Sequence, residues 1–437
     1  MVEKLVPKLR FNEFHDEWNT IFLNSILSFK NGFNASKDQY GFGTKFINVS
    51  DILENNYLTY DNIQDYVNIN DIELTNYIIE YGDIVFQRSS ENREEVGTAN
   101  VYLGSQPCVY GGFVIRGKKE GEYNPFFLKE LLQSTRVRKE ITSWSGGSTR
   151  YNIGQDSLNK ISIILPSIEE QNKIADLLLK VYEKIDLLEY KYQCYKNFKK
   201  YLMQQIFTQK LRFNEFDDEW KTVKLSNVAE IVGGGTPNTE VEEYWNGGIK
   251  WFTPSEIGKT KYISESDRYI SEEGLKNSSA KLLPKNTILL SSRATVGEIS
   301  IALTECSTNQ GFQSLITKNT VDNEFIYYLI STLKNEFLRR SSGSTFLEIS
   351  KNEIKKIKIN IPSLSEQKRI SSLFSSIDNK IDLLKIEHEK CLCFKKSLLQ
   401  QMFNYVLILN QYFVFVRFLI FLDYLLIFLI VFHTHNY

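Results

Sequence analysis

The sequence has few of the residues that most enzyme and metal sites require. Only four histidines and five cysteines occur in 437 residues, and no cysteines have the C-x2-C spacing of a zinc site. The histidines are His15 in a repeated phrase, His388 in a helical pattern, and His433 and His435 in the C-terminal tail. No Ser/His/Asp or Cys/His set is therefore available. The composition predicts a chain that is not catalytic by itself and binds no metal.

Nucleotide-binding fingerprints are also missing. The Gly-Lys-Thr at 258–260 would belong to a P-loop only with a further glycine five residues before Gly258, and Thr253 stands there. "GGGTPN" (233–238) lacks both the G-x-G-x-x-G pattern and a following helix. "YNPFF" (123–127) resembles the Asn-Pro-Pro-aromatic motif of amino-methyltransferases only faintly, because the second proline is missing. No cofactor is expected in this chain.

Neither sign of charge is in excess. Lys and Arg number 52 and Asp and Glu 53, a formal net charge of −1, so no global basic field indicates a nucleic-acid partner. Polyanion binding would need local patches or a basic partner subunit. The odd, irregularly spaced cysteines suit a reducing cytoplasm, and "MVEKLVPKLRFNEF" at the N-terminus lacks the apolar stretch of a secretory signal. We expect a cytoplasmic protein.

A long apolar run is found only in the C-terminal segment, 404–437. A membrane span needs about 20 apolar residues. Arg417 and Asp423 interrupt this run, and a charge at the bilayer centre costs roughly 2.5–3.5 kcal/mol. The abrupt change of composition favours translation past the usual stop, or a frameshift, over a tail anchor. Membrane association is not expected.

Internal repetition is the most informative feature that is present. "KLRFNEFHDEW" (8–18) returns as "KLRFNEFDDEW" (210–220) with one difference. The segment 165–207 matches 361–403 without a gap, with "KIDLL", "FKK" and "QQ" in register. The stretches between these repeats agree only loosely. The pattern predicts two copies of one unit, each with a variable body and a constant segment.

The constant segments have the pattern of long helices. Apolar residues recur in steps of four and three, and no Pro or Gly interrupts either segment. Ser167 and Ser363 are plausible N-caps, with Glu170 and Glu366 as capping-box partners. Two matched copies favour pairing with each other, as an antiparallel coiled coil, over burial in a larger bundle. The predicted seam residues are Ile174, Leu178, Val181, Ile185, Leu188, Tyr192, Ile370, Phe374, Ile377, Ile381, Leu384 and His388.

The variable bodies read as short strands broken by Gly, Asn and Asp, followed by short helices near 124–140 and 322–340. The predicted fold class is α+β, with two bodies of mixed strands and short helices joined by two long helices in a pseudo-two-fold arrangement. The predicted boundaries are 1–17 for the N-terminal repeated segment, 18–164 for the first body, 165–209 for the central helix, 210–360 for the second body with its repeated segment at 210–220, 361–403 for the C-terminal helix and 404–437 for the tail.

The repeated phrase precedes each body, so it is interpreted as a joint between a body and the shared helices. Its aromatic residues, Phe11, Phe14 and Trp18 with their counterparts Phe213, Phe216 and Trp220, are expected to pack. Arg10 and Arg212 are expected at a contact with another subunit.

Polar loops with interleaved Arg and aromatic residues are the candidate ligand contacts. Arg can pair bidentately with guanine and Asn or Gln with adenine, while Ser and Thr commonly hold phosphates. Most polar loops are merely solvated, so each loop alone is weak evidence. The candidates in the first body are Arg88, Ser89, Ser90, Asn92, Arg93, Ser148, Thr149, Arg150 and Tyr151. Those in the second body are Thr236, Asn238, Thr253, Ser255, Ser292, Arg293, Asn309, Gln310, Ser344 and Thr345.

Three motifs together resemble the specificity subunits of type I restriction–modification systems. "GGGTPNTEVEEYWNGGIKWFTPSEI" (233–257) is similar to the opening of a target-recognition domain of that family. The pattern "GSTR…L..I.I.LPS..EQ..I" at 147–174, with its second copy at 343–370 and the "KIDLL" helices, resembles the same family. The resemblance covers about residues 5–403. The tail after Phe403 departs from it, which puts full activity of this product in question.

The resemblance implies that each body reads one half of a bipartite site in double-stranded DNA, with the helices setting the spacer. It implies docking of two methyltransferase (modification) subunits for adenine methylation, and of restriction/translocase subunits. S-adenosylmethionine, ATP and Mg would then belong to those partners. One alternative is a coiled-coil interaction protein with two ligand-binding heads and no DNA role. A fused restriction–modification enzyme is opposed by the missing motifs.

Overall fold

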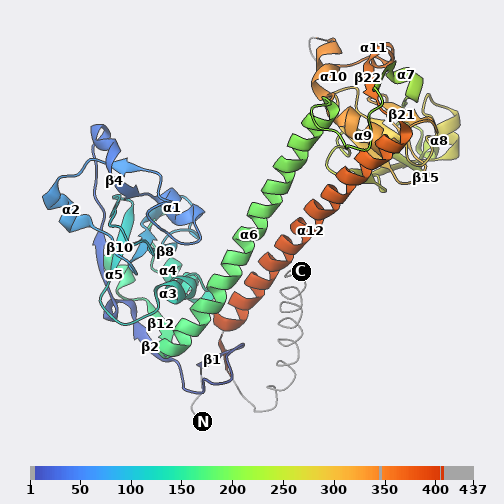
Figure 1. Cartoon of the computed structure of the whole chain (residues 1–437). Helices are drawn as coiled ribbons and strands as arrows, with labels where there is room; N and C mark the ends of the chain where they lie inside the picture. The colour runs from blue at the N-terminus through green and yellow to red at the C-terminus, as the bar shows by residue number, and fades with distance from the viewer. Residues whose placement is uncertain (1–4, 344–346, 404, 408–437) are drawn as a thin grey trace. The chain divides into compact units, whose positions relative to one another are not determined.

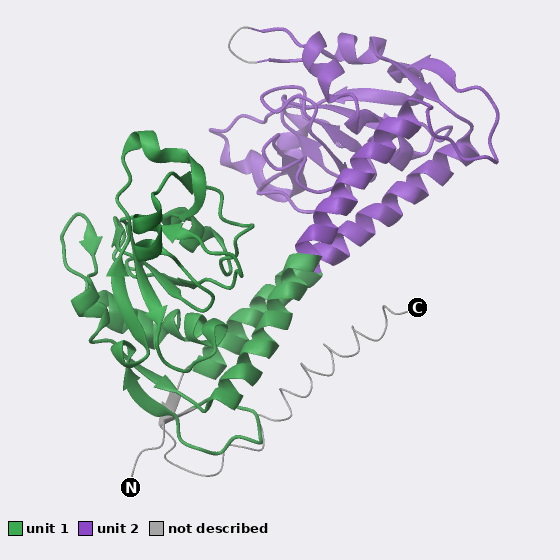
Figure 2. Cartoon of the chain, turned by 60° about the vertical axis from the view of Figure 1, so that its left-hand side comes forward, with its two compact units in different colours: residues 1–187, 387–437 green, residues 188–386 purple. Residues whose placement is uncertain are grey.

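The computed structural model describes residues 5–343, 347–403 and 405–407. It divides into two compact units, residues 1–187 with 387–437 (unit 1) and residues 188–386 (unit 2) (Figure 2). Each unit is a body of strands and short helices that packs against one half of each long helix (Figure 1). The α+β plan predicted from the sequence is confirmed. The boundary between the units crosses both long helices.

The body of unit 1 is built around a four-stranded antiparallel sheet of order β3-β10-β6-β8. Its central strand β6 is apolar enough to be buried along its whole length. A smaller sheet, β5-β4-β9, and the pairs β12-β2 and β11-β7 complete the body. The elements are β2 (Asn19–Phe22), β3 (Leu27–Asn31), β4 (Tyr40–Ile47), α1 (Val49–Glu54), β5 (Tyr66–Val67), α2 (Asp71–Tyr77), β6 (Ile84–Gln87), β7 (Ser89–Ser90), β8 (Ala99–Val101), β9 (Val109–Tyr110), β10 (Val114–Lys119), α3 (Pro125–Leu132), α4 (Thr135–Ser143), β11 (Tyr151–Asn152), α5 (Gln155–Leu158) and β12 (Ser162–Leu165).

The body of unit 2 follows the same plan with a five-stranded sheet of order β14-β21-β18-β19-β16. A second sheet has the order β17-β15-β20, and β13 pairs with β22. The elements are β13 (Lys221–Lys224), α7 (Leu225–Val228), β14 (Ala229–Gly233), β15 (Trp245–Phe252), β16 (Tyr262–Ile263), β17 (Arg268–Ile270), α8 (Glu272–Lys276), β18 (Ile288–Leu290), β19 (Ile299–Ala302), β20 (Ser307–Thr308), β21 (Gln313–Thr317), α9 (Asn323–Ser331), α10 (Lys334–Arg340), α11 (Lys351–Lys356) and β22 (Lys358–Ile361).

The long helices are α6 (Ile168–Phe207) and α12 (Leu364–Phe403), each of 40 residues. Within unit 2, the second half of α6 and the first half of α12 contribute to one hydrophobic core, so the two helices run antiparallel there. Among the predicted seam residues, Tyr192, Ile381 and His388 are half-buried. The buried ones are Ile174, Leu178, Val181, Ile185, Leu188, Ile370, Phe374, Ile377 and Leu384.

The repeated phrase is held to the start of a long helix by a buried ion pair. In unit 1, Nε and Nη2 of Arg10 each donate to a carboxylate oxygen of Glu170, at 2.8 Å, and the Glu170 side chain is 1% exposed. In unit 2, Arg212 makes the same pair of bonds to Glu366, at 2.9 and 2.8 Å. Both arginines therefore bind inside their own unit, and a contact with another subunit stays a prediction.

The same geometry corrects the predicted capping boxes. The hydroxyl oxygens of Ser167 and Ser363 do accept the N–H groups of Glu170 and Glu366, at 3.4 Å. Both oxygens of each carboxylate, however, accept from the arginine of the repeated phrase. A capping box requires the carboxylate to accept from the N-cap backbone. The two glutamates instead fix the repeated phrase.

The glutamine after each of these glutamates connects the long helix to a short helix of the body. Oε1 of Gln171 accepts the N–H of Asn124, the N-cap residue of α3, at 3.0 Å. Oε1 of Gln367 accepts the N–H of Asp322, the N-cap residue of α9, at 2.9 Å. Each glutamine also donates to the carbonyl of the proline five residues earlier. The repeated "LPS..EQ" motif therefore attaches each body to its helix.

The repeated phrase lies at the end of a long helix in both units. In unit 2 it follows α6 directly, and the N–H of Leu211 donates to Gln205 O at 3.2 Å. In unit 1 it begins the chain, yet the N–H of Leu9 donates to Gln401 O of α12 at 2.9 Å. Strand β1 (Leu5–Pro7) also pairs antiparallel with β23 (Tyr405–Leu407). The tail prediction for 404–437 lies, apart from β23, outside the described residues.

Three of the six aromatic residues of the phrase, Trp18, Phe213 and Trp220, pack as expected. Trp18 is 4% exposed and meets Phe127 of α3 edge-on, with ring centroids 6.1 Å apart. Trp220 meets Phe325 of α9 in the same way, also at 6.1 Å. Phe213 packs against the unit 2 core. The phrase is a joint in both units.

Candidate nucleic-acid interface

Three loops of unit 1 that are far apart in the sequence meet at one edge of the body. They are the loop between β6 and β8, the turn at 111–113 before β10, and the hairpin at 146–152. The N–H of Arg88 donates to Phe113 O at 2.8 Å, and the N–H of Ile153 donates to Arg88 O at 3.0 Å. Strands β7 and β11 pair in the same place. Two of these loops carry all nine candidate residues of the first body.

Unit 2 has the same frame. The N–H of Ser292 donates to Gly311 O at 2.8 Å, and the N–H of Ile349 donates to Ser292 O at 2.9 Å. These bonds join the predicted loops 290–297 and 307–312 to each other and to Ile349, which follows the predicted loop 341–346. The "GGGTPN" loop lies beside them, because the N–H of Gly235 donates to Thr308 O at 2.9 Å. Backbone bonds therefore hold the candidate loops together in both units, independent of the side chains they carry.

Four candidates of the first body, Ser89, Ser90, Asn92 and Arg150, line one cavity of about 390 Å³. Its floor is polar, because the Glu95 carboxylate accepts from the Ser90 hydroxyl at 3.1 Å and from Asn92 Nδ2 at 3.3 Å. The Arg150 guanidinium lies 3.8 Å from Glu91 and is 60% exposed. The cavity thus offers carboxylate and amide acceptors beside an accessible cation, a combination that suits base edges and phosphates.

The sequence interpretation missed five residues that line this cavity, Val49, Gln87, Glu91, Glu95 and Phe113. Phe113 lines it with a 62% exposed ring, and Glu95 supplies its carboxylate. The "GGF" at 111–113 indicated a tight turn before an aromatic residue, which could have drawn attention to Phe113. Nothing in the sequence distinguishes Glu95 from the neighbouring acidic residues.

The other candidates of the first body are partly used in the loop frame. Arg88 Nη1 donates to Gly112 O at 3.2 Å, and Arg93 Nη2 donates to Thr142 O at 3.5 Å. Ser148 and Thr149 are exposed, and Tyr151 is half-buried. Contact with DNA remains a prediction for all of them.

In the second body, several candidates bond to one another. The Thr236 hydroxyl donates to Gln310, and the Thr253 hydroxyl lies 3.0 Å from the Ser255 hydroxyl. Asn238 and Asn309 accept backbone N–H groups of Glu240 and Gly311. Arg293 is exposed, whereas Ser292 is fully buried and could touch DNA only after a rearrangement. Ser344 and Thr345 lie outside the described residues.

A structural match between the units adds one further candidate. The N–H of Thr253, after β15, donates to the Glu256 carboxylate at 2.6 Å. The N–H of Asn48, after β4, donates to the Asp51 carboxylate at 2.7 Å. Asn48 is therefore the first body's counterpart of Thr253. The sequences of the two variable bodies agree too loosely to predict this correspondence.

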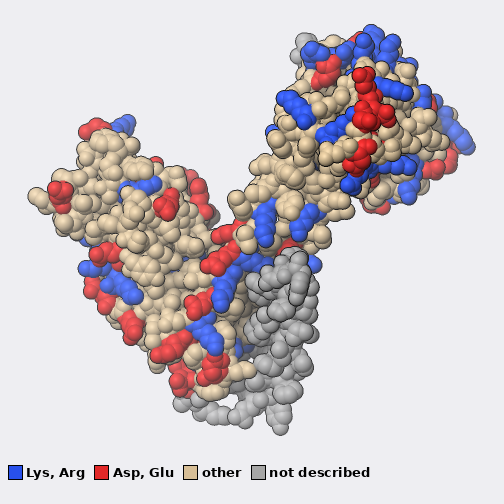
Figure 3. Space-filling view, viewed as in Figure 1, with Lys and Arg blue, Asp and Glu red and all other residues tan. Residues whose placement is uncertain are grey.

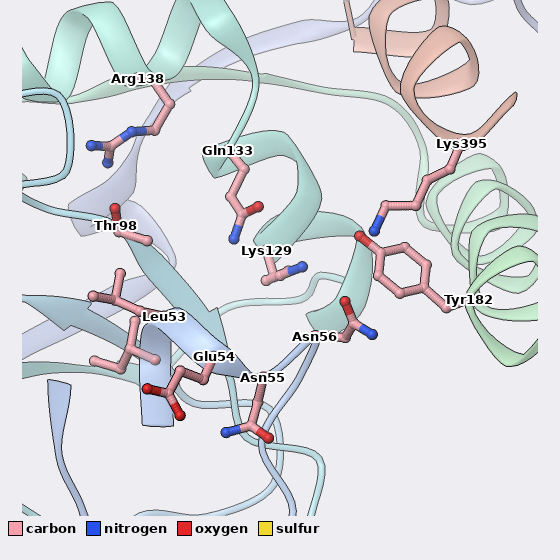
Figure 4. A pocket seen from close by; sticks show the side chains of 11 residues that line it. Leu53, Glu54, Asn55, Asn56, Thr98, Lys129, Gln133, Arg138, Tyr182 and Lys395 are labelled. Carbon is pink, nitrogen blue, oxygen red and sulfur yellow. The ribbon is translucent and has the colours of Figure 1, made fainter. Parts of the chain in front are cut away.

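A second cavity in unit 1, of about 360 Å³, lies where the body meets the long helices (Figure 4). Two of its lining residues bond to the buried Glu130 carboxylate, which accepts from Lys129 at 2.6 Å and from the Tyr182 hydroxyl at 2.7 Å. The Lys395 ammonium lies 3.7 Å from the centroid of the Tyr182 ring, and burial lowers the pKa of Lys395. The network anchors the body to α6 and α12.

Unit 2 has a corresponding anchor with different residues. The Tyr328 hydroxyl donates to Asp378 at 2.6 Å, and Lys199, the counterpart of Lys395, lies 2.5 Å from the same carboxylate. Lys261 also donates to the Tyr328 hydroxyl, at 2.8 Å. Both anchors are polar networks in which cations lie beside carboxylates of the same unit, which is a structural role.

No group of three or more His, Cys, Asp or Glu residues within the described part of the chain is arranged to hold a metal ion. None of the helices among those residues is both long and apolar enough to span a bilayer.

The chain matches a family model twice, at residues 15–194 and 217–391, and that family is the type I restriction modification DNA specificity domain. The two matches cover both halves of the repeat. The chain therefore belongs to this family and carries two copies of its domain.

Individual relatives have the same character. Over 175 residues the chain is 39% identical to the type I restriction enzyme MjaIX specificity subunit of Methanocaldococcus jannaschii, a match covering 39% of this chain and 40% of that relative. It is 26% identical to the putative MjaX specificity subunit of the same organism, over 91% of this chain and 95% of the relative. It is 28% identical to the Escherichia coli EcoR124I/EcoR124II specificity subunit, over 53% and 59%.

Solved structures share the fold. The S subunit of a type I restriction–modification system from M. genitalium superimposes with a TM-score of 0.57 at 17% identity, covering 91% of this chain and 99% of that chain. A chain from structural work on complex assembly and conformational transition of the type I R-M system gives 0.55 at 17% identity, covering 89% and 97%.

Proposed function

We propose that this chain is the DNA-reading subunit of a type I restriction–modification complex. Each body reads one half of a bipartite site in double-stranded DNA. The observation that carries the proposal is the loop frame, which repeats bond for bond around Arg88 and Ser292 while its side chains differ. A constant backbone arrangement of the loops with different side chains suits two bodies that bind unrelated half-sites.

The long helices would set the spacer between the half-sites and dock the modification subunits. Their outer faces carry large apolar side chains that the chain itself leaves exposed. On the unit 2 part of α6, Tyr190 and Tyr201 are 68% and 57% exposed, and on α12 Leu383 is 61% exposed. Apolar residues on the outside of a helical pair favour association with further helices. Methylation and cleavage, with S-adenosylmethionine, ATP and Mg, belong to those partners, and the complex works in the cytoplasm.

Loop substitutions should affect one half-site at a time. In an Arg150→Ala or Asn92→Ala variant, we expect affinity for the cognate site to fall by about 1–3 kcal/mol, roughly 5- to 150-fold. Discrimination should relax only at the half-site that unit 1 reads. Arg293→Ala is the matched variant and should relax the other half-site. Binding of the assembled complex to DNA libraries randomised in each half measures this, and relaxation of both halves by one variant would contradict the assignment.

The proposal as a whole is tested by sequencing the methylome of the host with and without this gene. We expect an adenine-methylated bipartite motif to disappear on deletion and return on complementation. An unchanged methylome in a host that expresses the modification subunits would favour the alternative, a coiled-coil protein with two ligand-binding heads.

A further inference from the structure

Six lysines gather on unit 2 at positions where unit 1 is nearly uncharged. The repeat aligns "EWKTVK" (219–224) with "EWNTIF" (17–22), and "KNEIKKIK" (351–358) with "QDSLNKIS" (155–162). Unit 1 keeps only Lys160 at these positions. Figure 3 shows Lys and Arg side chains over the part of unit 2 that carries α10 and α11. The lysines, called the lysine ribbon below, are Lys221, Lys224, Lys351, Lys355, Lys356 and Lys358.

The lysine ribbon lies on three elements of unit 2. Lys221 and Lys224 are on β13, Lys358 is on β22, and the others are on α11, which directly precedes β22 in the sequence. Lys224 and Lys358 are directly opposite in the antiparallel β13–β22 pair. On the same face, the Thr222 hydroxyl donates to Asn360 Oδ1 at 2.7 Å. The opposite face is apolar and faces the core, with Ile359 3% exposed. The outward face of this pair therefore presents ammonium, hydroxyl and amide groups.

The lysines are poorly neutralised within the chain. All six are exposed, and the nearby carboxylate of Glu353 is shared between Lys356, at 2.7 Å, and Arg340, at 3.3 Å. Like charges directly opposite on neighbouring strands are unfavourable. Unit 1 has Phe22 and Ser162 at the positions of Lys224 and Lys358, so the fold does not require the two charges. An anionic ligand would relieve their repulsion.

We propose that the lysine ribbon of unit 2 binds the DNA backbone, so that unit 2 makes contacts to DNA phosphates that unit 1 lacks. This inference rests on the proposed function, because it takes duplex DNA as the partner. Lys, Thr and Asn side chains are common contacts to phosphate oxygens. A regular polyanion also matches a row of cations better than scattered carboxylates do. The two half-sites would then contribute unequally to the salt dependence of binding.

The test is the salt dependence of DNA binding by the complex assembled with its modification subunits. For Lys224→Gln with Lys358→Gln, we expect the slope of log K against log salt to become shallower by about 0.9 for each phosphate that the variant no longer neutralises. The base preference at both half-sites should not change, because backbone contacts carry no sequence information. The pair Lys281→Gln with Lys285→Gln removes the same charge from exposed positions outside the ribbon and should leave the slope unchanged.

An unchanged slope in the ribbon variant, or an equal change in the Lys281/Lys285 control, would overturn the inference. So would a ribbon variant that assembles poorly with the modification subunits but keeps its slope, since that result would assign the surface to an acidic protein partner. Thermal unfolding checks that the variant is folded. If the complex without any substitution does not discriminate its target from other DNA, that result contradicts the proposed function and not the inference about the lysine ribbon.

Discussion

An Arg10→Ala variant is expected to destabilise the joint of unit 1 by about 3 kcal/mol. The change leaves the Glu170 carboxylate, which is 1% exposed, without its bidentate partner. It also removes the 2.6 Å bond from Arg10 Nη2 to Asp16 O that closes the repeated phrase. Hydrogen exchange of the peptide covering residues 8–18 should become about a hundredfold faster. Arg212→Ala should act in the same direction on residues 210–220 of unit 2.

Lys173→Ala is the matched control for this prediction. Lys173 lies two residues after Gln171 and forms an ion pair with Glu13 of the same phrase, but both side chains are nearly half exposed. Exposed pairs contribute at most about 1 kcal/mol. If Lys173→Ala and Arg10→Ala accelerated exchange equally, the burial of the Arg10–Glu170 pair would not be what holds the joint.

Lengthening both long helices by one heptad is expected to change the recognised spacer by about three base pairs. Seven residues extend a helix by about 10 Å, and the base-pair step is 3.4 Å. Insertions after Leu187 in α6 and after Leu383 in α12 fall at matching positions of the repeat and keep the apolar steps in phase. Methylation of the original motif should disappear, and a motif with the same half-sites and a longer spacer should replace it.

The control inserts seven residues into α6 alone. The two helices then differ in length, so the antiparallel pairing cannot stay in register along both. We expect this variant to lose methylation of every motif. If the double insertion methylated the original spacing, the helices would not be the ruler.

The repeat made the fold predictable to an unusual degree. Apolar steps of four and three, with no Pro or Gly, identified both helices to within a few residues of Ile168–Phe207 and Leu364–Phe403. The turn residues in the variable bodies indicated short strands. Strand boundaries were less predictable. The segment "KFINVSDIL" (45–53) has a β-like composition throughout, whereas Asn48 is the N-cap of a helix that starts at Val49.

The joint was misread for a physical reason. An arginine in a polar phrase is compatible with any carboxylate, and its partner Glu170 is 160 residues away. Glu170 itself fits a capping box by local spacing. Only the tertiary structure shows that Arg10 and the N-cap backbone compete for the Glu170 carboxylate, and a bidentate bond to arginine is the stronger interaction.

The sequence located the candidate loops better than it located their accessible side chains. Three candidates of the loop "FQRSSENREEVG" (86–97), Ser89, Ser90 and Asn92, line one cavity, and their contact with DNA stays a prediction. Ser292 was a candidate for the same reason, as a polar residue in a polar loop, yet its side chain is fully buried. Ser292 lies outside any strand, between isolated bridge residues Ser291 and Arg293, so no regular alternation in the sequence indicates which of these side chains faces the core.

Replacing one body is the most direct test of the claim that each body reads its own half-site while both share the long helices and the repeated phrases. Residues 229–357 would be exchanged for the corresponding body of another family member, keeping both long helices and both repeated phrases, and the methylome would be sequenced. The account predicts a motif in which one half-site changes while the other half-site and the spacer stay the same. A change in both half-sites, or in the spacer, would contradict it.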